Sequence, residues 1–202
     1  MNPRFLLCPC IDTTYILQLL HIGEAVSSPH VTPPILETAR RYLAAGLSVI
    51  PVRADGSKAA AVKWDEFKDR MPTDAELVLW FGSGRAVGLA IVCGKVSGNL
   101  AVMDFESQSG WDRWRERLNA SGHLAALDGL PIVRTPKGGR HLYCRIPEGW
   151  VAGTKLAMVS RNETLVEIRG QGHYVLAPGC PAACHPLNVP YTVEQQGWLP
   201  NG

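Results

Sequence analysis

Apolar and polar positions along this chain follow two different periods, and each period predicts an element. A helix is expected where apolar residues recur at helical spacing ahead of Gly46, at Leu36, Ala39 and Leu43. The apolar run 47–52 that follows predicts a strand. A second helix is expected from Thr73, because its hydroxyl and the Glu76 side chain form the pattern of a capping box.

Later apolar runs, separated by glycine and proline, predict a sheet. The runs 87–93 and 99–105 are expected to be neighbouring strands that a hairpin with a longer loop would join. An amphipathic helix is expected between 109 and 122, with its tryptophans in the core. Further short strands are predicted at 132–135, 140–146, 164–169 and 173–177. This order predicts an α/β or α+β fold with a mainly antiparallel sheet.

Composition limits the classes of protein that this chain could be. It has 202 residues, of which 46% are hydrophobic and 19% are charged, enough for one domain with a substantial core. The formal net charge of +2 excludes a protein that binds nucleic acid through bulk positive charge, so any site for a polyanion must be local. The apolar runs are far shorter than the roughly 18 residues of a membrane span, so no membrane partner is expected.

A cluster of serine and proline near residue 30 predicts a domain boundary. We expect residues 1–30 to be a loosely structured extension, 31–195 to be the main domain and 196–202 to be a C-terminal tail. Cys93 and Cys144 lie in apolar strand-like runs, where a free cysteine packs as a small hydrophobe. The cysteines therefore do not predict a disulfide framework, and a reducing, cytoplasmic location is expected.

Two carboxylates lie at the end of the predicted strand 99–105. Asp104 and Glu106 are two residues apart, so on a strand both would project to one face while Phe105 projects to the other. Mg²⁺ and similar hard cations take oxygen ligands, often one or two carboxylates together with substrate phosphates. The pair is a candidate metal site, although carboxylates at strand ends commonly just meet water.

A glycine turn with basic side chains precedes the next predicted strand. It runs RTPKGGRH from Arg134 to His141. Gly138 and Gly139 would let backbone amides approach an anion, and Arg134 or Lys137 would supply positive charge. Phosphate contact by His141 then becomes reasonable. The alternative is a hairpin turn whose charges are solvated.

Glu167 and Arg169 share one face of a later predicted strand. They would form a cross-strand ion pair in a purely structural role. In a functional role, Glu167 would be a third carboxylate facing the first two, and Arg169 would contact a triphosphate. Residues 131–170 contain seven basic and three acidic side chains, whereas 101–130 contain three basic and five acidic ones. An acidic strand end followed by basic strands suits a metal ion with a polyphosphate.

Taken in order, these motifs resemble the bifunctional DNA primase/polymerase (prim-pol) domain of the archaeo-eukaryotic primase superfamily. The resemblance runs from about Ala39 to Tyr191 and includes Lys58 and Trp64 after the first strand. Its motifs are AxxYLAAGLSVIPV, VGLAIVCGKVSGNLAVMDFE, RTPKGGRHLY and VEIRGQGHYVLAPG. The resemblance implies a catalytic sheet like that of RNA-recognition (RRM) domains, preceded by an additional α/β unit.

The same resemblance implies metal-dependent, template-directed nucleotidyl transfer in the replication of a plasmid, phage or other mobile element. By motif position, Asp104, Glu106 and Glu167 would hold two divalent ions, Mg²⁺ or Mn²⁺. His141 would contact the incoming nucleotide. The other implied nucleotide-binding residues are Arg134, Lys137, Gly138, Gly139, Arg169 and Lys58. The implied partners are a single-stranded DNA template with its primer and a dNTP or NTP.

The sequence departs from the family pattern in ways that affect these roles. Lys137 stands where many relatives carry serine, which makes contact with a triphosphate more electrostatic. The segment around Lys58 lacks the usual Lys followed closely by Pro, so Lys63 is an alternative contact. Relatives commonly continue into a helical accessory segment and a helicase. De novo priming is therefore expected to be weaker than primer extension, or to depend on such a partner supplied in trans.

Two other functions compete with this interpretation. A metal-dependent nuclease would use the same three carboxylates to direct water onto a phosphodiester, but Arg169 occupies the place of the usual nuclease lysine. A catalytically silent module would bind nucleic acid or nucleotide alone. Zinc binding by Cys180, Cys184 and His185 is also considered, but the spacing is loose and a fourth ligand would have to come from elsewhere.

Overall fold

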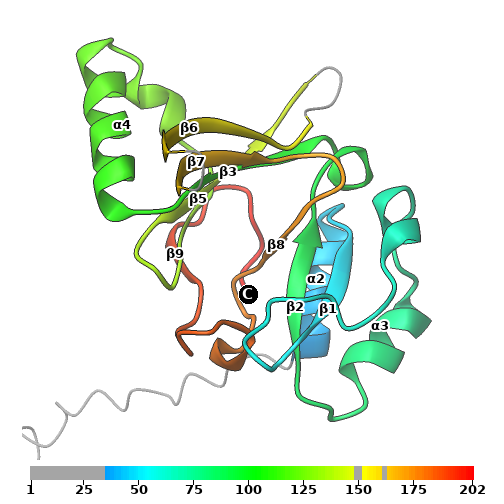
Figure 1. Ribbon diagram of the computed structural model, residues 1–202. Helices are drawn as coiled ribbons and strands as arrows, with labels where there is room; N and C mark the ends of the chain where they lie inside the picture. The colour runs from blue at the N-terminus through cyan, green and yellow to red at the C-terminus, as the bar shows by residue number, and fades with distance from the viewer. Residues whose placement is uncertain (1–34, 148–151, 161–162) are drawn as a thin grey trace, which may run out of the picture. The chain divides into compact units, whose positions relative to one another are not determined.

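The computed structural model describes residues 35–147, 152–160 and 163–202 (Figure 1). The expected extension 1–30 lies outside these residues. The described chain belongs to one compact unit that runs to Gly202. Its helices are α2 (Ile35–Ala44), α3 (Asp74–Phe81) and α4 (Gln108–Ala120). In this part of the chain, no helix is both long enough and apolar enough to cross a membrane.

A small antiparallel sheet forms one layer of the unit. Its strand order is β1-β2-β8, with bounds Val49–Arg53, Val87–Val92 and Tyr174–Leu176. The apolar runs that form β1 and β2 are almost entirely buried. Helices α2 and α3 contribute Tyr42, Leu77 and Phe81 to the same core, and they lie beside β1 and β2 in Figure 1.

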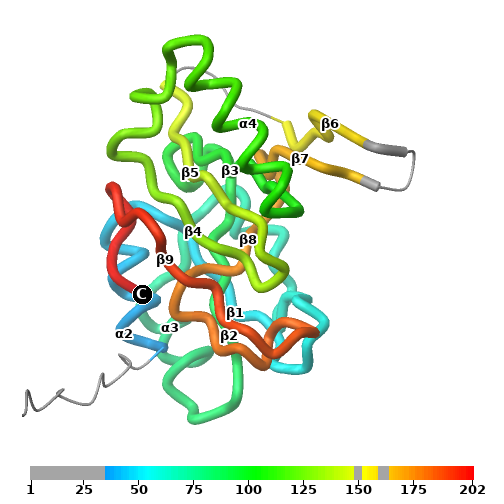
Figure 2. The backbone as a smooth tube through the Cα atoms, turned by 90° about the vertical axis from the view of Figure 1, so that its left-hand side faces the viewer, coloured from blue at the N-terminus to red at the C-terminus, as the bar shows by residue number. Residues whose placement is uncertain are grey.

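A larger antiparallel sheet carries most of the residues of interest. Its strand order is β6-β7-β3-β5-β4-β9. In chain order its strands are β3 (Leu100–Phe105), β4 (Ile132–Arg134), β5 (Arg140–Arg145), β6 (Thr154–Ser160), β7 (Glu163–Arg169) and β9 (Thr192–Gln195). Figure 2 shows β6 and β7 as a hairpin at one edge of this sheet.

The larger sheet is covered by different layers on its two faces. On one face, Phe105 packs against Trp111 and Trp114 of α4, with ring centroids 5.0 Å apart in each pair. On the other face, Val102 and Tyr143 join the core that also contains β1 and β2. Side chains alternate between the faces of a strand, so Asp104 points toward the smaller sheet and away from α4.

Several predictions from the hydrophobic pattern are confirmed. The three helices and the first strand lie within a few residues of the expected positions. Thr73 forms the predicted capping box, because its side chain accepts a hydrogen bond from the Glu76 amide and the Glu76 side chain accepts one from the Thr73 amide. Trp111 is buried, as expected for a core tryptophan. The described residues form a mixed α+β fold in which the sheets are antiparallel.

One expectation is wrong. Strands β2 and β3 do not form a hairpin: Gly94, at φ +98°, and a 3₁₀ turn (Lys95–Ser97) lead the chain from one sheet to the other, and only a Gly94–Leu100 bridge joins the two runs. Within the segment 196–202, Leu199 is buried in the core that also contains β1 and β2.

Candidate active site

Three neighbouring strands of the larger sheet bring the main candidate residues to paired positions, side by side across the strands. Asp104 of β3 is paired with His141 of β5 on one side and with Glu167 of β7 on the other. Residues paired across antiparallel strands project to the same face. The structure therefore brings together one aspartate, one glutamate and one histidine that lie far apart in the sequence.

Asp104 is held between two cationic or potentially cationic groups. Its Oδ1 lies 3.4 Å from His141 Nε2, and its Oδ2 lies 3.4 Å from Arg169 Nη2. Burial on its own raises the pKa of Asp104, but the charges and hydrogen bonds of His141 and Arg169 outweigh this effect and lower it. Asp104 is therefore ionised at neutral pH despite its position inside the fold.

His141 is a buried histidine with one unused ring nitrogen. Its side chain is 5% exposed, and its ring lies against that of Tyr191 at a centroid distance of 5.4 Å. While Nε2 faces Asp104, Nδ1 finds no hydrogen-bond partner among the described residues. A buried polar atom without a partner is costly, and such atoms are uncommon in folded proteins. His141 thus offers a hydrogen-bonding site to a ligand.

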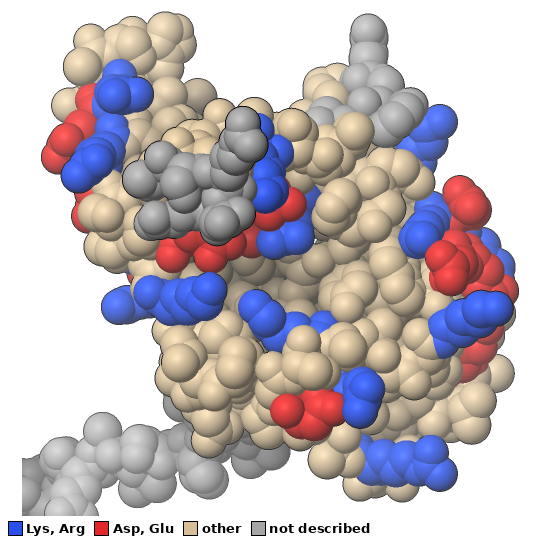
Figure 3. Space-filling model, viewed as in Figure 1, with Lys and Arg blue, Asp and Glu red and all other residues tan. Residues whose placement is uncertain are grey.

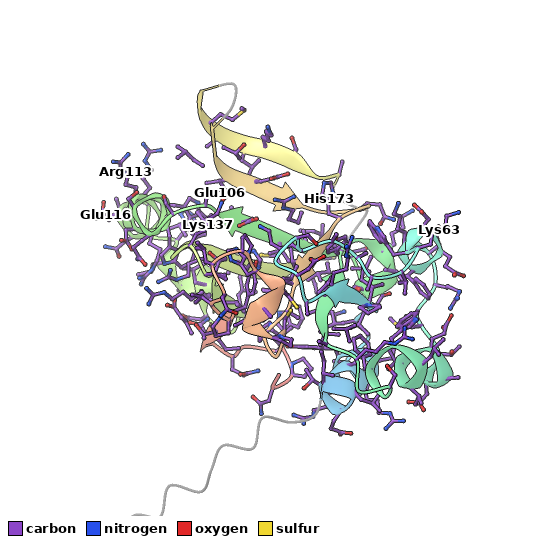
Figure 4. The ribbon with its side chains drawn as sticks, turned by 60° about the horizontal axis from the view of Figure 1, so that its bottom comes forward. Lys63, Glu106, Arg113, Glu116, Lys137 and His173 are labelled. Atoms are coloured by element: carbon purple, nitrogen blue, oxygen red, sulfur yellow. The ribbon has the colours of Figure 1, made fainter. Side chains whose placement is uncertain are left out.

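Glu106 lies directly after the end of β3, at the rim of the site. Its carboxylate is 3.6 Å from Lys137 Nζ, and the two residues are neighbours in Figure 4. The turn that carries Lys137 therefore lies beside the end of β3, as the predicted functional role requires. Of the two glycines in this turn, however, Gly138 donates its amide to the Thr135 carbonyl, so that amide is not available to an anion.

Gly139 is needed for a reason that the sequence did not indicate. A Cβ at this position would collide with the Phe105 carbonyl oxygen and would lie 3.0 Å from the Glu106 carbonyl carbon. The absence of a side chain thus lets β5 begin against the end of β3. Gly139 supports the position of Glu106 by close packing, whereas Gly138 has open space around it.

A cavity of about 470 Å³ lies between the two sheets and is bordered by the site. Asp104, His141 and Arg169 border it from the larger sheet, and Lys58 borders it from the loop after β1. In Figure 3, acidic and basic side chains lie side by side around the hollow on this face. The alternative lysine, Lys63, does not border the cavity and lies away from Glu106 and Lys137 in Figure 4.

Tyr174 is a residue of this site that the sequence analysis did not single out. Its hydroxyl donates a hydrogen bond to the Lys58 carbonyl at 3.0 Å and accepts one from the Ala60 amide at 3.2 Å. Lys58 has a φ of 60°, in the left-handed region that residues other than glycine rarely adopt. Tyr174 thereby holds the Lys58 loop at the edge of the cavity, with its ring against that of Trp64.

Lys155 is a second residue that the sequence analysis missed. It lies on β6 and is paired with Glu167, so it extends the row of charged residues to the exposed edge of the sheet. The hydrophobic pattern did not predict β6, and no motif marks Lys155. Its place in the row depends on the strand order alone.

Arg134 is a predicted nucleotide contact that the fold places on another face of the sheet. It is paired with Arg140, which is paired with Phe105, so all three project toward the face that α4 covers. Asp104 and His141 are on the opposite face. The fold therefore does not bring the Arg134 side chain to Asp104 and His141. Its neighbour Arg140 is buried and donates hydrogen bonds to the carbonyls of Gly138 and Gly139. These bonds hold the turn from the face of the sheet that α4 covers.

No cluster of three or more His, Cys, Asp or Glu side chains that could hold a metal ion occurs in the described parts of the chain. In the site, Arg169 lies against Asp104 and Glu167, and Lys137 lies against Glu106. Of the residues considered for zinc, the thiols of Cys180 and Cys184 contact each other, and His185 Nδ1 accepts a hydrogen bond from the Leu187 amide.

The fold and site define an α+β domain in which acidic and basic side chains border a cavity between two antiparallel sheets. The family model described as "Bifunctional DNA primase/polymerase, N-terminal" (Prim-Pol) matches residues 39–199. The chain therefore belongs to this family, and at the level of the family it is a DNA primase/polymerase-type nucleotidyltransferase domain whose substrates are DNA and nucleotides. No curated protein matches the chain.

Proposed function

We propose that this domain catalyses template-directed nucleotidyl transfer, adding a dNTP or NTP to a primer on a single-stranded DNA template. The observation that carries the proposal is the row of Glu167, Asp104 and His141 beside a cavity that Lys58 also borders. The Asp104 carboxylate and the basic groups of Lys58 and Arg169 border one cavity there. A nucleoside triphosphate needs this combination, because its phosphates are anionic and are bound together with divalent cations.

The donor atoms of the site fit Mg²⁺ or Mn²⁺ by their chemistry. Carboxylate oxygens are the ligands that such ions take, and oxygens of Asp104 and Glu167 already approach one cationic nitrogen of Arg169. We propose that Asp104, Glu106 and Glu167 hold the ions. When bound, divalent ions neutralise the charge that develops on the attacking and leaving oxygens in phosphoryl transfer.

The other side chains of the site would position the nucleotide. His141 Nδ1, buried and without a partner among the described residues, would hydrogen-bond to a phosphate oxygen. Lys58 and Arg169 border the same cavity and would neutralise the triphosphate. The Asp104 carboxylate keeps the His141 ring in place through Nε2. These roles require no covalent intermediate on the protein.

The biological setting remains a proposal that rests on the family resemblance. We infer a cytoplasmic protein that acts in replication of a plasmid, phage or other mobile element. A helicase or helical accessory segment supplied in trans would help it to retain the template. The modest charge of +2 supports this dependence, because long-range attraction for DNA is weak at such a net charge.

Primer extension tests the proposal. The wild-type protein is incubated with a primed template, dNTPs and Mg²⁺ or Mn²⁺, beside the double variant Asp104→Asn/Glu106→Gln. The matched control is Glu116→Gln, because Glu116 is an exposed carboxylate on α4, on the other side of the sheet (Figure 4). We expect the double variant to lose at least about a hundredfold in rate, as enzymes do when groups that stabilise transition-state charge are removed.

Other outcomes would replace the proposal. Unchanged extension by the double variant contradicts the assignment of the carboxylates. Degradation of the template without dNTPs identifies a nuclease. Nucleotide binding without incorporation under either metal identifies a binding module.

A further inference from the structure

The Arg169 guanidinium occupies the place between two carboxylates of the site. Its Nη2 lies 3.0 Å from Glu167 Oε2 and 3.4 Å from Asp104 Oδ2. The two carboxylate side chains are largely buried, whereas the arginine side chain is 30% exposed. One nitrogen on a long and partly exposed side chain thus contacts both acids.

This arrangement has a clear electrostatic reason. Two carboxylates side by side in a poorly solvated place repel each other, and one of them would be expected to bind a proton. The Arg169 charge lies between the two carboxylates and reduces that repulsion. A cation therefore already lies between the two carboxylates before any metal ion arrives.

A divalent ion would need the same oxygens that Arg169 contacts. A guanidinium and a metal ion cannot share them closely, because like charges a few ångströms apart repel strongly in such surroundings. We propose that Arg169 is a resident counter-cation, and that a divalent ion binds Asp104 and Glu167 by displacing its guanidinium. This inference rests on the metal site of the proposed function and adds an exchange step to it.

The exchange would leave the rest of the site in place. His141 contacts Oδ1 of Asp104, whereas Arg169 contacts Oδ2. Departure of the guanidinium therefore frees one oxygen of the aspartate while His141 continues to orient the other. Asp104 does not have to change position to accept the ion.

The displaced guanidinium could bind a phosphate of the nucleotide instead. Arg169 borders the cavity, and a guanidinium binds phosphate oxygens through two parallel hydrogen bonds. Binding of a metal ion would release Arg169 to a triphosphate, and binding of a triphosphate would withdraw Arg169 from the carboxylates. Each ligand would then increase the affinity for the other, because such coupling is reciprocal.

Direct binding of Mn²⁺ without DNA or nucleotide tests the displacement. The Kd for Mn²⁺ is measured by electron paramagnetic resonance for wild type, Arg169→Gln and the matched control Arg113→Gln, whose exposed arginine lies on α4 (Figure 4). We expect Arg169→Gln to bind Mn²⁺ at least about fivefold more tightly, because no cation has to leave. Arg113→Gln should match wild type. An unchanged or weaker affinity in Arg169→Gln overturns the displacement.

Two further measurements keep the result unambiguous. Arg169→Gln leaves two acids without their counter-charge, so its melting temperature should rise more on addition of Mn²⁺ than that of wild type. An equal rise contradicts the inference. Arg169→Lys retains the charge and should bind Mn²⁺ more weakly than Arg169→Gln. Equal affinities of the two variants would also contradict it.

A third variant separates this inference from the proposed function. Asp104→Asn should weaken Mn²⁺ binding in any protein that uses this carboxylate for metal. If Asp104→Asn weakens binding but Arg169→Gln does not strengthen it, the displacement is wrong and the metal site stands. If Asp104→Asn has no effect on Mn²⁺ binding, the metal site of the proposed function is wrong, and the displacement is wrong with it.

Discussion

Replacement of Gly139 by alanine should show how closely the turn before His141 is packed against the acidic strand. The new methyl group would overlap the Phe105 carbonyl oxygen and crowd the Glu106 backbone, so β5 and β3 would have to separate. Overpacking of this kind costs about 1–3 kcal/mol. Loss of the hydrogen bond from the Thr135 amide to the Gly139 carbonyl would add about 1 kcal/mol.

The free energy of unfolding should therefore fall by about 2–4 kcal/mol. For a domain of this size, each kcal/mol lowers the melting temperature by about 2–4 °C, so a decrease of roughly 5–15 °C is expected. Gly138→Ala is the matched control. Its φ of +86° strains an alanine by about 1–2 kcal/mol, but the space around it is open.

Urea denaturation and thermal melting of both variants give the comparison, and primer extension by the folded protein gives the functional consequence. Gly139→Ala should also slow extension, because the strain acts on the backbone that carries Glu106. If Gly139→Ala is as stable as Gly138→Ala, or extends primers at the wild-type rate, the argument from close packing is refuted.

Two further predictions follow from contacts of the site. Tyr174→Phe removes the hydroxyl that holds the Lys58 loop, so steady-state kinetics should show a KM for nucleotide raised several-fold with little change in kcat; a fall in kcat alone would contradict this role. The folded-state pKa of Asp104 lies below its ordinary value of 3.8, so its contribution to stability is complete above about pH 4 and is lost as the pH falls through the lowered pKa. Urea denaturation from pH 6 to pH 2 should show that Asp104→Asn loses less stability on acidification than wild type, and parallel curves would refute the assignment.

Local patterns in the sequence were sufficient to predict the helices and most strands. The capping box at Thr73 and the tryptophan spacing in α4 are formed by residues within one or two helical turns of each other, so their signals are present in short windows. The motifs around Asp104, His141 and Glu167 likewise indicated which residues matter, and the register of the larger sheet places these three side by side.

What the sequence did not reveal depends on the order and pairing of strands. Arg134 was assigned to the nucleotide because it lies in the same turn as Lys137, but the pairing with Arg140 turns its side chain to the other face. Lys155 joins the row of charged residues only because β6 is the neighbour of β7. Tyr174 reaches the Lys58 loop across more than one hundred residues of sequence. The spacing of apolar and polar residues within one segment does not indicate which strands become neighbours.

The carboxylates beside His141 are proposed to support incorporation that the template directs. Single-turnover incorporation is measured on four primed templates that differ only in the next template base, with wild type, Glu167→Gln and the control Glu116→Gln. We expect wild type and Glu116→Gln to add the complementary nucleotide on each template, and Glu167→Gln to add it at least about a hundredfold more slowly. Incorporation that ignores the template base, or that survives unchanged in Glu167→Gln, would show that these carboxylates do not have this role.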